Sequence, residues 1–186
     1  MAKIQKAISS NVMNFNEITN IDKNPKIEKY KDGIQLLNSL NYKAYLYQKL
    51  FFENKEEKYS QKAISTYLSC DTLISKMRKN LLSTQDKIKF GEDNYMIYEA
   101  SVKLCIELAD IYSDNLEQSN KYKKLAFYFS EQNKASVLLE SIASADALKF
   151  SGIPDTLLNL VRKFNIDIAS YSNLKNIEED DSIKNF

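Results

Sequence analysis

The sequence contains no histidine and no tryptophan, and its 186 residues include only three glycines, two prolines and two cysteines. Cys–His catalysis, Ser–His–Asp catalysis and histidine-based metal sites all need an imidazole, so these chemistries are excluded within these residues. A β-sandwich or barrel uses glycine and proline at its many turns, and their scarcity argues against both folds. The composition therefore predicts few turns and long helices.

The charge is nearly balanced, with 26 basic and 25 acidic residues and a formal net charge of +1. A nucleic-acid binder normally carries a basic excess on one face, so no nucleic-acid partner is expected. No apolar run reaches the roughly 18 residues that a membrane span needs, and the first residues lack the apolar region of a signal peptide. We therefore expect a cytoplasmic protein, or a cytoplasmic part of a larger one, with no membrane partner.

The two cysteines, Cys70 and Cys105, lie 35 residues apart inside apolar helical patterns. We interpret them as reduced thiols in the core of a cytosolic protein, with a disulfide or a metal pair as the alternatives. The acidic run over residues 178–181 lacks the alternating ligands and the glycine of a calcium loop, which favours a solvated tail. No catalytic residue, cofactor or metal site is expected.

Three regions of the chain differ in pattern. Residues 1–33 form a poorly patterned N-terminal segment, with a short helix near residues 4–15 and a loop around Pro25. Residues 34–175 form the helical domain, and residues 176–186 form an acidic tail that is expected to fray. The chain is thus predicted to hold one folded domain between two less regular ends.

Apolar residues recur at steps of three and four over five segments, which indicates amphipathic helices. These segments are 34–52, 57–82, 86–115 with a break near Gly91, 120–150 and 155–173. Ser83 to Asp86 and Ser119 are expected to cap helix starts, and Ser151 to Pro154 form a turn. No segment alternates like a β-strand. The prediction is an all-α fold of antiparallel helical pairs, with an ordinary helical bundle as the alternative arrangement.

Two spacing patterns occur twice, which suggests an internal repeat. The first is Leu40-x3-Ala44-x2-Tyr47, echoed by Cys105-x3-Ala109-x2-Tyr112, and the second is Ala63-x3-Tyr67-x2-Cys70, echoed by Ala126-x3-Ser130-x2-Asn133. In these units a small alanine lets a neighbouring backbone approach and a tyrosine fills the space between helices. The pattern resembles tetratricopeptide repeats, and the resemblance implies antiparallel hairpins stacked as an elongated tetratricopeptide-like superhelix.

The repeats depart from the tetratricopeptide pattern. Tyr47 and Ala63 are 16 residues apart and Tyr112 and Ala126 are 14 apart, where the usual repeat has about nine. Lys43 stands where the family has leucine. The units therefore resemble elongated and degenerate hairpins.

The C-terminal half carries a second resemblance, in residues 125–141, 145–155 and 166–171. These runs resemble the helical repeat region that precedes the caspase-like CHAT domain in bacterial tetratricopeptide–CHAT proteins, over roughly residues 40–175. In that family the catalytic histidine and cysteine belong to the downstream domain. The resemblance implies a bacterial, truncated member whose full-length form would hold a CHAT domain as a partner of the repeats.

Two functions follow from these resemblances. The first is a non-enzymatic scaffold that binds a peptide or partner protein, and the alternative is the regulatory half of a CHAT-type cysteine peptidase whose catalytic domain is absent from this chain. In stacked hairpins the first helix of each pair lines the concave groove. The expected partner-binding residues are Asn38, Asn41, Tyr45, Gln48, Lys103, Ile106, Asp110 and Ser113. Their other interpretation is ordinary solvated positions.

The last predicted helix, residues 155–173, carries more apolar positions than one stripe can bury. Because an exposed apolar face is unfavourable for a soluble monomer, self-association through this helix is expected.

Overall fold

The computed structural model describes residues 1–81, 83–132, 154, 156–157, 159–160, 163–164 and 166–167. Its helices are α1 (Ala2–Asn11), α2 (Gly33–Asn54), α3 (Glu57–Lys79), α4 (Thr84–Asp93) and α5 (Tyr95–Ile111). A further helix covers residues 116–132, and the described residues between 156 and 167 are also helical. The described part of the chain contains an isolated antiparallel bridge between Val12 and Tyr30 but no strand. The all-α prediction is confirmed.

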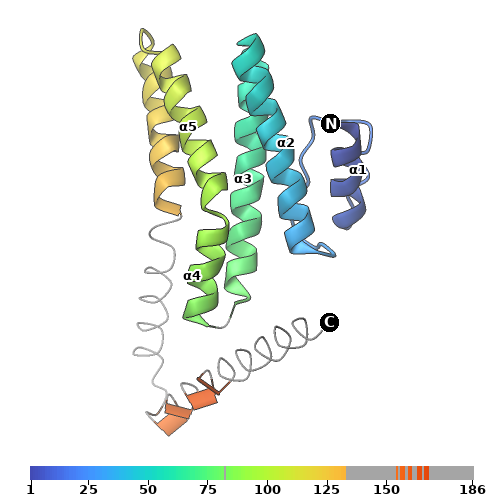
Figure 1. Cartoon of the computed structure of the whole chain (residues 1–186), viewed down its shortest axis with the longest axis vertical. Helices are drawn as coiled ribbons and strands as arrows, with labels where there is room; N and C mark the ends of the chain where they lie inside the picture. The colour runs from blue at the N-terminus through green and yellow to red at the C-terminus, as the bar shows by residue number, and fades with distance from the viewer. Residues whose placement is uncertain are drawn as a thin grey trace, which may run out of the picture.

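Helices α2 and α3 form a long antiparallel pair at the centre of the molecule (Figure 1). The Asp32 side chain caps α2 by accepting a hydrogen bond from the Gln35 amide at 2.9 Å, and Lys55 ends α2 in the left-handed region with φ of 58°. Small and large side chains alternate in the interface between α2 and α3. Ala44 and Ala63 are fully buried, and Tyr47 and Tyr67 fill the space around them.

Helices α4 and α5 follow one another along nearly the same direction (Figure 1). The Ser83 hydroxyl accepts a hydrogen bond from the Asp86 amide at 3.0 Å, which confirms the predicted cap. The predicted break near Gly91 is wrong by three residues: the helices separate at Asn94, whose side chain donates to the Phe90 carbonyl at 2.7 Å. Such a side-chain bond competes with the backbone ladder and favours an interruption.

The helix over residues 116–132 begins four residues earlier than predicted. The Asn115 side chain accepts a hydrogen bond from the Gln118 amide at 3.1 Å and so serves as its N-cap. Ser119, the predicted cap, instead lies inside this helix, and its buried hydroxyl donates to the Ala109 carbonyl of α5 at 2.9 Å. That hydrogen bond ties the second helical pair together.

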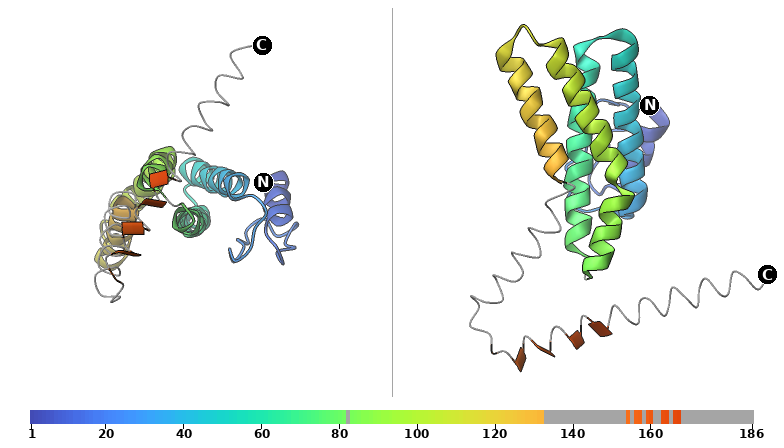
Figure 2. Two further views of the ribbon diagram at one scale, coloured as in Figure 1. Left: turned by 90° about the horizontal axis from the view of Figure 1, so that it is seen from below. Right: turned by 60° about the vertical axis from the view of Figure 1, so that its left-hand side comes forward.

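The four long helices form two neighbouring antiparallel pairs. Helix α3 contacts both α2 and α5, and α2 and α5 also contact each other. Seen along the helices, α2 and α5 lie on one side of the array, with α3 on the other (Figure 2, left). The structure therefore places the first helices of the two pairs on a common face.

The N-terminal segment, residues 1–33, packs against α2. Its apolar side chains Ile8, Val12, Phe15 and Ile27 are buried in the same core cluster as the helical pairs. Pro25 lies in irregular backbone, as predicted. The sparse apolar residues of this segment are thus sufficient to cover one end of the array.

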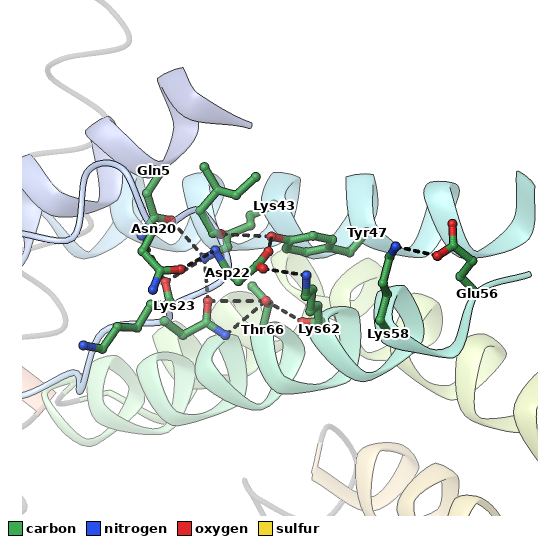
Figure 3. A network of polar contacts seen from close by, with 12 residues as sticks. Gln5, Asn20, Asp22, Lys23, Lys43, Tyr47, Glu56, Lys58, Lys62 and Thr66 are labelled. Atoms are coloured by element: carbon green, nitrogen blue, oxygen red, sulfur yellow. Dashed lines mark hydrogen bonds and ion pairs between the residues drawn. The ribbon is translucent and has the colours of Figure 1, made fainter. Parts of the chain in front are cut away.

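A buried lysine holds this segment in place (Figure 3). Lys43 of α2 is only 1% exposed, and its ammonium donates to the side chains of Gln5 and Asn24 and to the Lys23 carbonyl, each at 2.9 Å. Burial lowers the pKa of Lys43 to about 8, and the Asp22 carboxylate opposes that shift. All three ammonium protons are hydrogen-bonded, so the cation is fully satisfied where the repeat pattern would have placed leucine.

Asp22 extends the same network towards α3. It accepts hydrogen bonds at 2.6 Å from the Tyr47 hydroxyl and from the Lys62 ammonium. These two bonds, that from Lys62 first, lower the pKa of Asp22. The network therefore connects the N-terminal segment to both helices of the central pair.

Several predicted features lie outside the described residues. These are the end of the 120–150 helix, the turn before Pro154, most of the 155–173 helix and the acidic tail.

Candidate binding groove

The two thiols are placed for packing. Cys70 of α3 and Cys105 of α5 are free and fully buried. Burial raises the pKa of Cys105 to about 12 and raises that of Cys70 further, so neither is a thiolate at neutral pH. In the part of the chain that the structure describes, no three potential ligands gather to hold a metal ion, and no helix is long and apolar enough to cross a membrane.

A groove runs between the first helices of the two pairs, with a volume of about 440 Å³. We call it the α2–α5 groove. Its lining residues are Tyr45, Gln48, Lys49 and Phe52 from α2 and Met96, Glu99, Ala100 and Lys103 from α5. Apolar and aromatic groups form most of this surface, and charged groups stand at its edges.

A second cavity of about 460 Å³ lies on the other side of α5. We call it the distal cavity, because it is farther from the N-terminal segment. It is lined by Tyr95, Tyr98, Glu99, Val102, Lys103, Ile106 and Glu107 of α5 and by Phe129 and Ser130. Glu99 and Lys103 border both hollows and separate them.

Three of the eight predicted binding residues line the α2–α5 groove, and a fourth lines only the distal cavity. Tyr45 and Gln48 line the α2–α5 groove, Lys103 borders both hollows, and Ile106 lines the distal cavity. The remaining four, Asn38, Asn41, Asp110 and Ser113, line neither hollow. Ser113 also lies beyond the end of α5 at Ile111.

Gln48 does not offer its amide to a ligand. The side chain is 6% exposed, and its oxygen accepts a hydrogen bond from the Tyr67 hydroxyl at 2.5 Å. Its nitrogen donates to the Ala100 carbonyl at 3.3 Å. Gln48 therefore joins α2, α3 and α5 beneath the groove, because its position in the apolar stripe of α2 turns it inward.

Residues that the repeat frame did not identify complete the groove. Met96 is 68% exposed at the start of α5, and Phe52 lies at the far end of α2. The ring of Tyr42 stacks on Tyr45 with centroids 6.3 Å apart, which widens the aromatic surface. The position of Met96 could not be assigned because the break in this helix was expected near Gly91, whereas α5 begins after Asn94. The sequence signal available for this surface was a set of aromatic residues on the helix predicted over residues 34–52.

A tyrosine–aspartate cluster lies next to the distal cavity and shares Tyr98 with its lining. The buried Asp71 carboxylate of α3 accepts hydrogen bonds from the hydroxyls of Tyr98, at 2.9 Å, and Tyr128, at 2.6 Å. Burial and the hydrogen bond to Asp71 raise the pKa of Tyr128 to about 12. The two hydrogen bonds therefore join α3, α5 and the helix over residues 116–132 at one carboxylate.

The groove can bind apolar side chains, and its rim can pair with charges. Lys49, Glu99 and Lys103 place both signs of charge around it. Lys55 and Glu107 form a weak exposed ion pair at 3.8 Å beyond the rim. An apolar groove with charges of both signs at its rim can bind a peptide segment of another protein.

No protein-family model, curated protein or solved structure matches the chain. The function is therefore argued from the geometry of the helices and the two hollows.

Proposed function

We propose that this chain is a non-enzymatic interaction module of tetratricopeptide-like architecture that binds a peptide segment of a partner protein in the α2–α5 groove. The observation that carries the proposal is that the first helices of two antiparallel pairs lie side by side with an apolar groove between them. Helical-repeat modules dock extended or helical segments on the face that their first helices line.

Burial of the small repeat residues supports the repeat architecture. Ala44, Ala63 and Ala109 are at most 2% exposed, and Ala126 is 7% exposed. Small residues at these positions let helices approach closely, and their burial supports the packing role that the repeat pattern proposes for each alanine. The buried Lys43 departs from the tetratricopeptide pattern, which has leucine at this position, because its ammonium donates hydrogen bonds to the N-terminal segment.

The ligand chemistry follows from the groove. Tyr45 and Phe52 offer aromatic faces, and Met96 is an adaptable apolar group that accommodates side chains of different shape. Glu99 and Lys103 at the rim can pair with either charge on the ligand. The expected ligand is a segment with a large apolar anchor residue flanked by polar residues.

A displayed library of random linear peptides tests the proposal. We expect enriched peptides to share a large apolar anchor, and Tyr45→Ala or Met96→Ala to weaken their binding about tenfold or more. The matched control is Leu68→Ala on α3, an exposed apolar residue that lines neither hollow. Failure to enrich any sequence, or equal binding by the groove and control variants, would refute a peptide-binding groove.

A further inference from the structure

A further concave surface lies on the N-terminal segment and shares no lining residue with the α2–α5 groove. Its first recess, of about 860 Å³, is lined entirely by the loop over residues 13–29. Its second recess, of about 730 Å³, lies between this loop and the C-terminal end of α3. The two recesses adjoin, because Met13, Glu28 and Lys29 line both. We call them together the basic surface.

Lysines outnumber acidic residues in the lining of the basic surface. The lysines are Lys23, Lys26, Lys29, Lys76 and Lys79, and the acidic residues are Glu17 and Glu28. The basic surface therefore has a net charge of +3, whereas the whole chain has a net charge of only +1. Positive charge is thus concentrated here, and a concave surface with an excess of one sign attracts ligands of the opposite sign.

Hydrogen bonds fix the backbone that carries these lysines. The loop is closed at its base, where the Met13 amide donates to the Lys29 carbonyl at 3.0 Å. The Lys76 ammonium of α3 donates to the Ile27 carbonyl and joins the loop to the helix. An ordered surface loses less conformational entropy on binding than a loose loop does, which favours affinity.

Most of this positive charge is available to a ligand. Among the described residues, no ion pair forms at Lys29, Lys76 or Lys79. The other two lysines form exposed pairs, Lys23 with Glu17 at 2.5 Å and Lys26 with Glu28 at 2.8 Å. Exposed pairs are weak, so a carboxylate of a ligand can compete with them.

Glu28 shows how the basic surface acts on a carboxylate. Its pKa is lowered, first by the hydrogen bond and charge of Lys26, and further by the charges of Lys76 and Lys29. Neighbouring ammonium groups lower the pKa of a carboxyl group because they favour its ionised form. A carboxylate of a ligand beside Lys29 would lie among the same ammonium groups.

The distribution of the charges favours a chain with several carboxylates over a single phosphate or a nucleic acid. Lys23 lines the first recess, Lys79 lines the second and Lys29 lines both, so a compact anion reaches only part of the charge. The cations of the lining are all lysines, and none is the arginine that pairs with phosphate through two parallel hydrogen bonds. Nucleic-acid bases stack on exposed aromatic rings, but the lining rings are the buried Phe15 and the half-buried Tyr30.

We propose that the basic surface binds an acidic peptide segment of a partner protein, whose carboxylates pair with Lys29, Lys76 and Lys79. The exposed amides of Asn16 and Asn80 offer donors and acceptors to the backbone of that peptide. Because the basic surface and the α2–α5 groove have separate linings, this proposal does not depend on the proposed function.

Fluorescence anisotropy of a labelled octaglutamate peptide, titrated with the full-length chain, tests the proposal. We expect binding that weakens with added salt, because salt screens exposed charges. Lys29→Glu should weaken binding about tenfold, because an attraction becomes a repulsion. The matched control is Lys124→Glu, which makes the same change of total charge at an exposed lysine outside both recesses and should weaken binding less than about twofold.

A second variant keeps the test independent of the fold of the loop. Lys79→Gln removes one charge at the end of α3 and should weaken binding about threefold, even if Lys29→Glu lowers the melting temperature. Tyr45→Ala should leave octaglutamate binding unchanged, because Tyr45 lines the α2–α5 groove and not the basic surface.

Four results would overturn the proposal. They are no binding of octaglutamate at low salt, equal losses for Lys29→Glu and Lys124→Glu, a loss in Tyr45→Ala, and tighter binding of an oligothymidylate of the same net charge. Equal losses would show that only the total charge matters, and a loss in Tyr45→Ala would place the peptide in the α2–α5 groove. Tighter binding of the oligothymidylate would assign the surface to a phosphate backbone.

Discussion

Replacing Lys43 by methionine tests whether one buried cation fastens the N-terminal segment to the helical pairs. Methionine has a similar length and no donor, so the variant leaves the oxygens of Gln5, Lys23 and Asn24 without their shared ammonium. An unsatisfied buried acceptor costs about 1–3 kcal/mol, but removing the buried charge also relieves a desolvation penalty. We expect a net loss of about 2–4 kcal/mol in the free energy of unfolding.

Urea denaturation followed by circular dichroism measures this loss. Lys49→Met is the matched control, because Lys49 lies on the same helix with its side chain 57% exposed. The control should change the free energy of unfolding by less than about 0.5 kcal/mol. If both variants unfold at the same urea concentration as the parent, the ammonium contributes nothing and the hydrogen bonds of Figure 3 do not hold the segment.

The pH dependence gives an independent check on Lys43. Burial lowers its folded-state pKa from 10.5 to about 8, so between these values the unfolded chain binds more protons and stability rises with pH. With partial solvent screening the gain should be about 2 kcal/mol. Above about pH 9, buried cysteines and tyrosines with raised pKa values lower the stability as the pH rises. This effect is the same in the parent and in Lys43→Met. The difference between parent and variant should therefore grow from pH 7 to pH 9.5, and a constant difference would contradict the shift.

Two further substitutions test the packing of the second helical pair. Ala109→Leu should lower the free energy of unfolding by about 1–3 kcal/mol, because it overpacks a site that is 2% exposed. The control, Ala100→Leu at the edge of the α2–α5 groove, should cost less. An unchanged melting temperature for Ala109→Leu would contradict the proposed repeat pattern. Asp71→Asn should cost about 1–2 kcal/mol, because an amide offers one acceptor oxygen to two tyrosine hydroxyls. When Asp71→Asn is made in a chain that already carries Tyr128→Phe, it should lower the free energy of unfolding by less. Equal losses with and without Tyr128→Phe would show that the Tyr128 hydroxyl does not contribute.

The helices could be predicted from the sequence because their apolar stripes persist over many turns. Helix α2 was expected over residues 34–52 and covers Gly33–Asn54, since a long stripe fixes a helix even when its ends are uncertain. The errors lie at both ends of helices: α3 ends at Lys79 instead of residue 82, and α5 ends at Ile111 instead of residue 115. Asn94 and Asn115 act through side-chain hydrogen bonds that any asparagine could make, and only the fold selects these two.

The role of the N-terminal segment could not be predicted, for a related reason. Beyond the short helix predicted near residues 4–15, its few apolar residues carry no helical or strand period. Its attachment depends on hydrogen bonds to α2 and α3 that join residues 19 to 49 positions apart in sequence. Lys43 gave one local signal, a lysine inside an apolar stripe. Of the predicted binding residues, Tyr45 and Lys103 line the α2–α5 groove. Gln48 points inward and Met96 was missed, because side-chain direction depends on helix boundaries that the pattern leaves open.

The N-terminal segment should respond to mutation separately from α5, because polar contacts around Lys43 hold it against α2. Hydrogen exchange of the full-length chain can resolve this. Lys43→Met should speed exchange in residues 12–32 and leave α5 unchanged. Local opening of packed units makes such separation observable. If Lys43→Met also accelerates exchange in α5, the array opens as one cooperative unit. The N-terminal segment and α5 would then be coupled, and holding one of them in place would stabilise the other.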